Sequence, residues 1–114
     1  MVAFRVAAAV EVLTGLALLV TPDGVARLLL GVGLDAGGAA VGRLGGVGLI
    51  CFGLACWPVL GTSSPAARRA MLLFQPAIAL MLAVVAVSAD LRGVMLWPAV
   101  LYHAGATVWL TRHH

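Results

Sequence analysis

Charged side chains are scarce in this sequence of 114 residues: only 10% are charged, and lysine is absent. A soluble domain carries about 25% charged residues, because its water-facing surface needs them. Hydrophobic residues make up 63% of the chain, whereas a soluble domain has about 45–50% apolar residues. The composition therefore excludes a soluble globular protein and predicts an integral membrane protein.

Basic runs are missing as well. The basic residues are seven arginines, which lie near the ends of apolar stretches with no aromatic residues interleaved among them. A nucleic-acid-binding protein needs a basic patch or stripe to neutralise phosphates. The sequence therefore predicts no nucleic-acid partner, and we expect membrane lipids to be in contact with the chain.

Cysteine is rare, with only Cys51 and Cys56 present. Five residues apart on a helix of about 3.6 residues per turn, they point in directions about 140° apart. Such a pair cannot easily form a disulfide or share a metal ion. We expect two buried free thiols that behave as small apolar residues.

Long apolar stretches dominate the rest. About 20 apolar residues are needed to cross a bilayer, and Pro- and Gly-containing breaks separate the stretches. The first one is not read as a signal peptide, because Glu11 interrupts it and no small-residue cleavage site follows. We therefore predict one all-α domain over residues 1–114, a bundle of four transmembrane helices at about 4–20, 39–60, 66–89 and 94–111.

A shorter apolar segment, residues 25–34, lies between the first two predicted spans. It is too short to cross the membrane. Two interpretations are open. It is either an interfacial helix with Arg27 outward and its leucines in lipid, or a lid over the bundle.

Glycines mark the second predicted span. Gly38, Gly42 and Gly46 follow one another at four-residue spacing. Gly-x-x-x-Gly lets two helix backbones approach closely in a membrane. The row predicts a packed interface, either with another helix of this chain or with another subunit, and so a homo-oligomer or a larger membrane complex.

The arginines predict an orientation. Four spans place both termini and the 61–69 loop on one side, which holds no acid and four arginines: Arg5, Arg68, Arg69 and Arg112. The other side holds two arginines and three aspartates: Arg27, Arg92, Asp23, Asp35 and Asp90. The positive-inside rule then predicts an inner-membrane protein with both termini in the cytoplasm. We interpret His113 and His114 as the end of a purification tag and assign them no function.

Four polar residues lie at membrane depth: Glu11, Arg43, Gln75 and His103. Small residues three and four positions away flank all of them except Gln75. Small residues mark helix–helix interfaces, so we expect Glu11, Arg43 and His103 to point into the bundle. Gln75 precedes Pro76, and we expect it to satisfy backbone groups that the proline frees.

Two interpretations of this group are open. In the first, Glu11 pairs with Arg43 or His103, and the cluster sets the helix register. In the second, these side chains form the polar end of a site for a lipophilic ligand such as a quinone or a lipid. The sequence shows no metal-ligand spacing, no phosphate loop and no nucleophile–base pair. We therefore predict no catalytic residue, no metal and no resident cofactor, and favour a protein that is not an enzyme.

The first half of the chain is similar to the small bacterial four-helix membrane proteins grouped as DoxX-like. The matching residues are Glu11-x-x-x-Gly15-Leu16-x-Leu18-Leu19, Pro22, Leu29-Leu30-Gly31, the run Gly42-Arg43-Leu44-Gly45-Gly46-Val47-Gly48-Leu49-Ile50, Gly53 and Trp57. The resemblance implies a four-helix bundle and an accessory role beside quinone-linked oxidoreductases. It carries over only two positions, Glu11 and Arg43.

Three functions are compatible with these features. The first, which we favour from the sequence, is an accessory or assembly subunit that packs against a larger complex or against itself. The second is a binder of a small lipophilic ligand in a pocket within the bundle. The third is a subunit of a proton or small-solute transporter.

Overall fold

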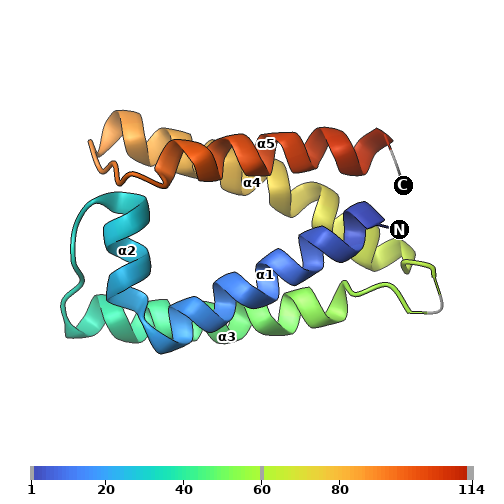
Figure 1. The fold of residues 1–114 in the computed structure, drawn as a ribbon, viewed down its shortest axis with the longest axis horizontal. Helices are drawn as coiled ribbons and strands as arrows, with labels where there is room; N and C mark the ends of the chain where they lie inside the picture. The colour runs from blue at the N-terminus through green and yellow to red at the C-terminus, as the bar shows by residue number, and fades with distance from the viewer. Residues whose placement is uncertain (1, 60, 113–114) are drawn as a thin grey trace.

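The computed structural model describes residues 2–59 and 61–112, and this part of the chain is all-α, as predicted (Figure 1). His113 and His114 lie outside the described residues. The helices are α1 (Val2–Val20), α2 (Pro22–Leu30), α3 (Ala36–Ala55), α4 (Pro65–Ser88) and α5 (Leu96–Arg112). The described residues contain no β-strand.

The short helix α2 begins and ends earlier than the predicted segment 25–34. It begins at Pro22, because the fixed φ of proline suits the first helical position and its missing N–H is not needed there. It ends at Leu30, where Gly31 adopts φ 74° and donates its N–H to the Arg27 carbonyl. Glycine adopts this left-handed conformation without a steric penalty.

Helix α3 is shifted toward the N-terminus relative to the predicted span 39–60. It begins at Ala36, because the Asp35 side chain accepts a hydrogen bond from the Gly38 N–H at 2.7 Å and caps the helix. It ends at Ala55, since Pro58 disfavours helical geometry in the residue before it. Leu60, the predicted end, is outside the described residues.

Three of the described helices, α1, α3 and α4, are long and apolar enough to cross a membrane, not the four that we predicted. Helix α5 has 17 residues, which rise about 26 Å against a hydrocarbon core about 30 Å thick. It starts at Leu96 rather than at residue 94 because α2 holds the preceding backbone. The N–H groups of Gly93 and Met95 donate to the carbonyls of Leu29 and Leu28 at 2.9 and 2.8 Å.

The long helices form two pairs, with α1 along α3 and α4 along α5 (Figure 1). Glycines allow the first pair to pack backbone against backbone. A Cβ added to Gly15 would lie 2.6 Å from the Gly46 carbonyl oxygen, and one added to Gly53 would lie 2.7 Å from the Ala8 oxygen. The glycines of α3 therefore serve an interface within this chain, which was one of the two expected arrangements.

The predicted row Gly38, Gly42 and Gly46 does not form that interface as a unit. Only Gly46 touches the α1 backbone, whereas a Cβ on Gly42 would meet Pro22 at 3.0 Å. Gly38 lies against Asp35 and Leu34, because it occupies the capped first turn of α3. The close contact instead continues from Gly46 to Gly53, seven residues later, which keeps both on the face toward α1.

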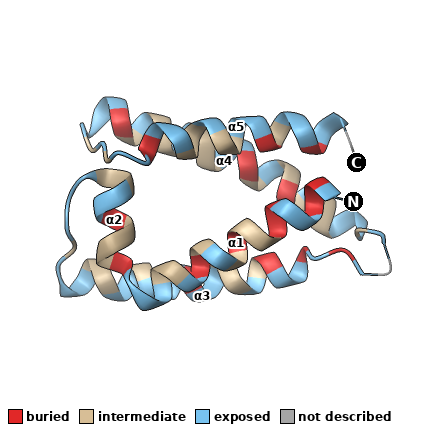
Figure 2. Cartoon of the chain, in the orientation of Figure 1, coloured by how far each residue is buried: buried red, intermediate tan, exposed pale blue. Residues whose placement is uncertain are grey.

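The two helix pairs meet at the end that holds both termini (Figures 1 and 2). Buried residues from α1, α4, α5 and the end of α3 form a core there: Ala3, Phe4, Ala7, Ala8, Cys56, Met71 and Leu110. At the opposite end α2 crosses between the pairs (Figure 1). The bundle is thus closed by side-chain packing at one end and by a short helix at the other.

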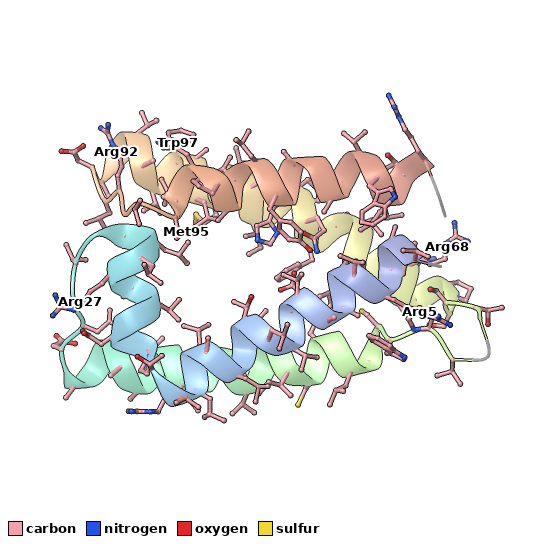
Figure 3. The ribbon with its side chains drawn as sticks, viewed as in Figure 1. Arg5, Arg27, Arg68, Arg92, Met95 and Trp97 are labelled. Carbon is pink, nitrogen blue, oxygen red and sulfur yellow. The ribbon has the colours of Figure 1, made fainter. Side chains whose placement is uncertain are left out.

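Charge follows the same two ends. Arg5 and Arg68 lie at the end with the termini, and Arg27 and Arg92 lie at the α2 end (Figure 3). The ion pairs found in the described residues, Arg27 with Asp23 and Arg92 with an aspartate two residues earlier, both lie at the α2 end. Between the ends, the outer faces of the long helices expose large apolar side chains, including Leu13, Leu44, Leu73, Leu80, Val87 and Leu101.

Candidate functional site

A central cavity of about 670 Å³ lies between the two helix pairs, and all five helices line it. This volume falls within the range of about 300–1,000 Å³ that holds small-molecule ligands. Its walls are mostly apolar, and its polar lining consists of Glu11, Thr14, Tyr102 and His103. The cavity combines a large apolar volume with a few convergent polar groups, which is the usual composition of a ligand site.

Glu11 lies on the buried face of α1, four residues after Ala7 and four before Gly15. This face packs toward the other helices, so Glu11 is only 2% exposed. Its Oε1 accepts a hydrogen bond from Gln75 Nε2 at 3.2 Å. No arginine contacts this carboxyl among the described residues. Glu11 is therefore held by a neutral amide and has no fixed countercharge there.

Gln75 is completely buried and links α1 to α5. Its Oε1 lies 2.6 Å from His103 Nδ1. An amide oxygen can only accept, so Nδ1 of His103 carries the proton of this hydrogen bond. A neutral His103 then presents Nε2 as an acceptor. We expected Gln75 to satisfy backbone groups near Pro76, whereas it joins Glu11 to His103.

Arg43 does not join this cluster, contrary to our expectation. It is exposed, and its Nε donates to the Leu19 carbonyl oxygen at 3.2 Å. Arg43 precedes Gly46 by less than one turn and lies at the edge of the α1–α3 interface. From there it reaches the last turn of α1, where carbonyl groups lack helical partners and the helix dipole is negative.

Of the four predicted residues, three therefore come together: Glu11, Gln75 and His103. The expected partners of Glu11 were Arg43 and His103. Gln75 is the observed partner of Glu11, and His103 is linked to Glu11 only through Gln75. The prediction that Glu11 and His103 point into the bundle is confirmed, since both line the central cavity.

Tyr102 and Phe74 line the cavity beside this cluster and were missed from the sequence. The Tyr102 ring lies 5.0 Å from the His103 ring, centroid to centroid, and the Phe74 ring lies 6.3 Å from it. The Tyr102 hydroxyl is buried and has no hydrogen-bond partner among the described residues. The one feature of the sequence that could have indicated Tyr102 as a site residue was its position next to His103. Adjacent helical residues do not share a face, so that signal was weak.

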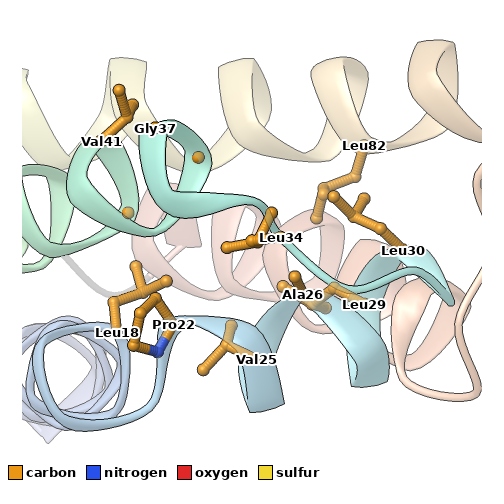
Figure 4. Close-up of a pocket in the computed structure, with 12 residues that line it drawn as sticks. Leu18, Pro22, Val25, Ala26, Leu29, Leu30, Leu34, Gly37, Val41 and Leu82 are labelled. Carbon is orange, nitrogen blue, oxygen red and sulfur yellow. The ribbon is translucent and has the colours of Figure 1, made fainter.

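A second cavity of about 520 Å³ adjoins the first under α2 (Figure 4). The described residues that line it carry no polar side chain. Four residues line both cavities: Leu18, Val25, Leu29 and Leu82. The apolar space therefore continues from the polar cluster toward the α2 end of the molecule.

Asp23 holds α2 over this space. Its carboxylate accepts hydrogen bonds from Arg27 Nε and from the Leu34 N–H, both at 2.7 Å. The side-chain hydrogen bond from Arg27, followed by the backbone hydrogen bond from Leu34, lowers the pKa of Asp23 below its ordinary value. At neutral pH Asp23 is therefore charged and links α2 to the connection that leads into α3.

No metal centre is formed within residues 2–59 and 61–112, where His, Cys, Asp and Glu do not gather in groups of three. Both cysteines are free, as expected, but only Cys56 is buried, whereas Cys51 is exposed, contrary to our prediction. Comparison of the chain with protein-family models, with curated proteins and with solved structures finds no match.

Proposed function

We propose that this protein crosses the membrane four times and binds one small lipophilic ligand in its central cavity. The polar head of the ligand lies against Glu11 and His103, and the apolar body extends toward α2. The observation that carries this proposal is the cavity itself, in which apolar walls from all five helices surround one polar cluster. Quinones and lipids have the required combination of a hydrogen-bonding head and an apolar body.

The four-span arrangement is supported by the course of the chain. Helix α5 lies along α4 and returns the C-terminus to the end that holds the N-terminus (Figure 1). Termini at the same end fit an even number of crossings, which supports a fourth crossing by α5. The excess of arginine at that end supports an orientation with both termini in the cytoplasm of an inner membrane and α2 at the outer surface.

The accessory-subunit function becomes the second candidate. Gly46 and Gly53, which would have offered a close-packing surface to a partner, are covered by α1 of the same chain. Membership of the DoxX-like family and a role beside an oxidoreductase rest on the residues quoted above. The observation that favours association is the broad exposed apolar surface of α3 and α4. A transporter subunit is a third candidate, which Glu11 at membrane depth favours.

A matched pair of glycine substitutions tests the cavity. Gly45 and Gly48 both lie on α3, and a Cβ at either would meet nothing within 4 Å. Gly45 lines the central cavity, whereas Gly48 does not. Leucine at either position improves helix propensity, so both variants should fold.

We expect native mass spectrometry from lipid nanodiscs to detect a one-to-one adduct with an added short-chain benzoquinone or short-chain diacylglycerol. The adduct should form with the wild type and with Gly48→Leu, and Gly45→Leu should lose it. Equal adducts in both variants, or none in the wild type, would contradict binding in the cavity.

A further inference from the structure

We infer that the ligand of the central cavity is a lipophilic organic cation, whose positive charge takes the place of a proton at Glu11. This inference rests on the proposed function, because it assigns a chemical class to the ligand of the same cavity. Four observations carry it: the absence of a fixed countercharge, the neighbours of Glu11, the aromatic lining and the size of the apolar space.

The positive charges of the chain lie away from the cavity. None of the seven arginines lines it, and the sequence contains no lysine. Arg43, the one arginine near membrane depth, is exposed and bonded to a backbone carbonyl. A carboxylate in the membrane interior costs several kcal/mol unless it is neutralised. Glu11 must therefore bind a proton or receive a positive charge from outside the chain.

The groups that face Glu11 supply no permanent charge. From α5 these are Tyr102 and His103, which line the same cavity. Cys56, after α3, is a buried free thiol of the core at the end with the termini. Helix α4 contributes the neutral amide of Gln75, and α2 contributes only apolar side chains to the cavity. The other polar groups are neutral, so an ionised Glu11 would repel an anionic head group and attract a cationic one.

Aromatic rings complete a site suited to a cation. Phe74 and Tyr102 line the cavity with Glu11. The face of an aromatic ring attracts a cation, and the attraction is stronger where water is excluded. The Tyr102 hydroxyl is buried without a partner among the described residues, beside the cavity that the Tyr102 side chain lines. The apolar walls toward α2 receive the organic body of the ligand.

Binding and deprotonation are then coupled. Protonated Glu11 releases its proton, and the carboxylate pairs with the incoming cation, so the net charge of the cavity is zero before and after exchange. Where Glu11 holds a proton in the unliganded protein, each rise of one pH unit should tighten binding about tenfold. The dependence should disappear once Glu11 is already ionised.

The experiment uses three probes of similar shape and different charge: tetraphenylphosphonium, tetraphenylborate and neutral triphenylphosphine oxide. None of them titrates near neutral pH, so any pH dependence belongs to the protein. Equilibrium dialysis with lipid nanodiscs measures binding, and protein-free nanodiscs correct for partitioning into lipid. We expect tetraphenylphosphonium to bind most tightly, with affinity that rises with pH, and tetraphenylborate not to bind.

Two variants complete the test. Glu11→Gln keeps an oxygen that can accept from Gln75 but removes the charge. It should weaken tetraphenylphosphonium binding about thirtyfold or more and abolish its pH dependence. The control Asp90→Asn removes a carboxylate at the α2 end and should change neither. Tighter binding of the neutral or anionic probe than of the cation would overturn the inference and leave the proposed function standing. Failure of all three probes would also overturn the inference, whereas the proposed function is decided separately by the quinone and diacylglycerol adducts.

Discussion

Gln75 shows how a single neutral side chain can organise a membrane interior. Its amide has a donor and an acceptor, and the structure uses each once toward another helix, with Nε2 to Glu11 and Oε1 to His103. A charged residue in its place would have brought a desolvation penalty of its own. Gln75 therefore connects α1, α4 and α5 without neutralising Glu11, which has no fixed countercharge among the described residues.

We predict that Gln75→Leu lowers the free energy of unfolding by about 1–3 kcal/mol for each buried polar group that it leaves without a partner. In a double-mutant cycle with His103→Phe, the two substitutions should couple by about 0.5–3 kcal/mol, because His103 has already lost its partner in the first variant. Reversible unfolding in mixed detergent micelles measures these free energies. Additive effects would show that the hydrogen bond between Gln75 and His103 contributes nothing.

At the scale of the helix, the glycines of α3 determine how closely another helix can approach. Helix α3 is rich in glycine throughout, yet its glycines have different surroundings. Those that face α1, such as Gly46, leave no room for a Cβ, whereas Gly48 faces open space. Their different contacts separate the effect of close backbone packing from the intrinsic flexibility of glycine.

We predict opposite signs for the same substitution at these two positions. Gly46→Ala should destabilise the protein by about 1–3 kcal/mol, because the new Cβ would lie 2.6 Å from the Gly15 carbonyl oxygen. Gly48→Ala should stabilise the helix by up to about 1 kcal/mol. Thermal unfolding in nanodiscs, followed by circular dichroism, compares the two. Destabilisation by Gly48→Ala would indicate that a second chain covers that face.

The molecule as a whole consists of two helix pairs that are packed together at one end and separated by α2 at the other. This arrangement leaves apolar space between the pairs, because the core near the termini and helix α2 at the other end hold the pairs apart. It also sorts charge, with arginines at the end of the termini and arginine–aspartate pairs at the α2 end.

We predict that Arg112→Cys and Arg68→Cys report the same side of the membrane and that Arg92→Cys reports the other. Each is made in a chain with Cys51 and Cys56 replaced by serine. A membrane-impermeant maleimide should label Arg92→Cys in intact spheroplasts and the other two only after lysis. If α5 did not cross, Arg112→Cys would label together with Arg92→Cys, and the four-span arrangement would be wrong.

The sequence by itself determined the class of protein, the all-α fold and the approximate helix positions. Apolar composition decides partitioning into a membrane, and Pro and Gly breaks act locally, so neither depends on the tertiary structure. The inward direction of Glu11 and His103 could also be predicted from small neighbours on the same helix face. The same pattern failed for Arg43, which is exposed. Pro58 should also have predicted the earlier end of α3, since its effect on the preceding residue is local.

Only the tertiary structure decided which groups meet. Glu11 bonds to Gln75 rather than to the predicted Arg43 because of how α1 and α4 are placed relative to each other. Arg43 instead bonds to a carbonyl group of α1. The late start of α5 depends on hydrogen bonds from its preceding loop to α2, a helix more than 60 residues earlier. The cavity exists because α2 spans the gap between two helix pairs, and no local pattern in the sequence encodes that distance.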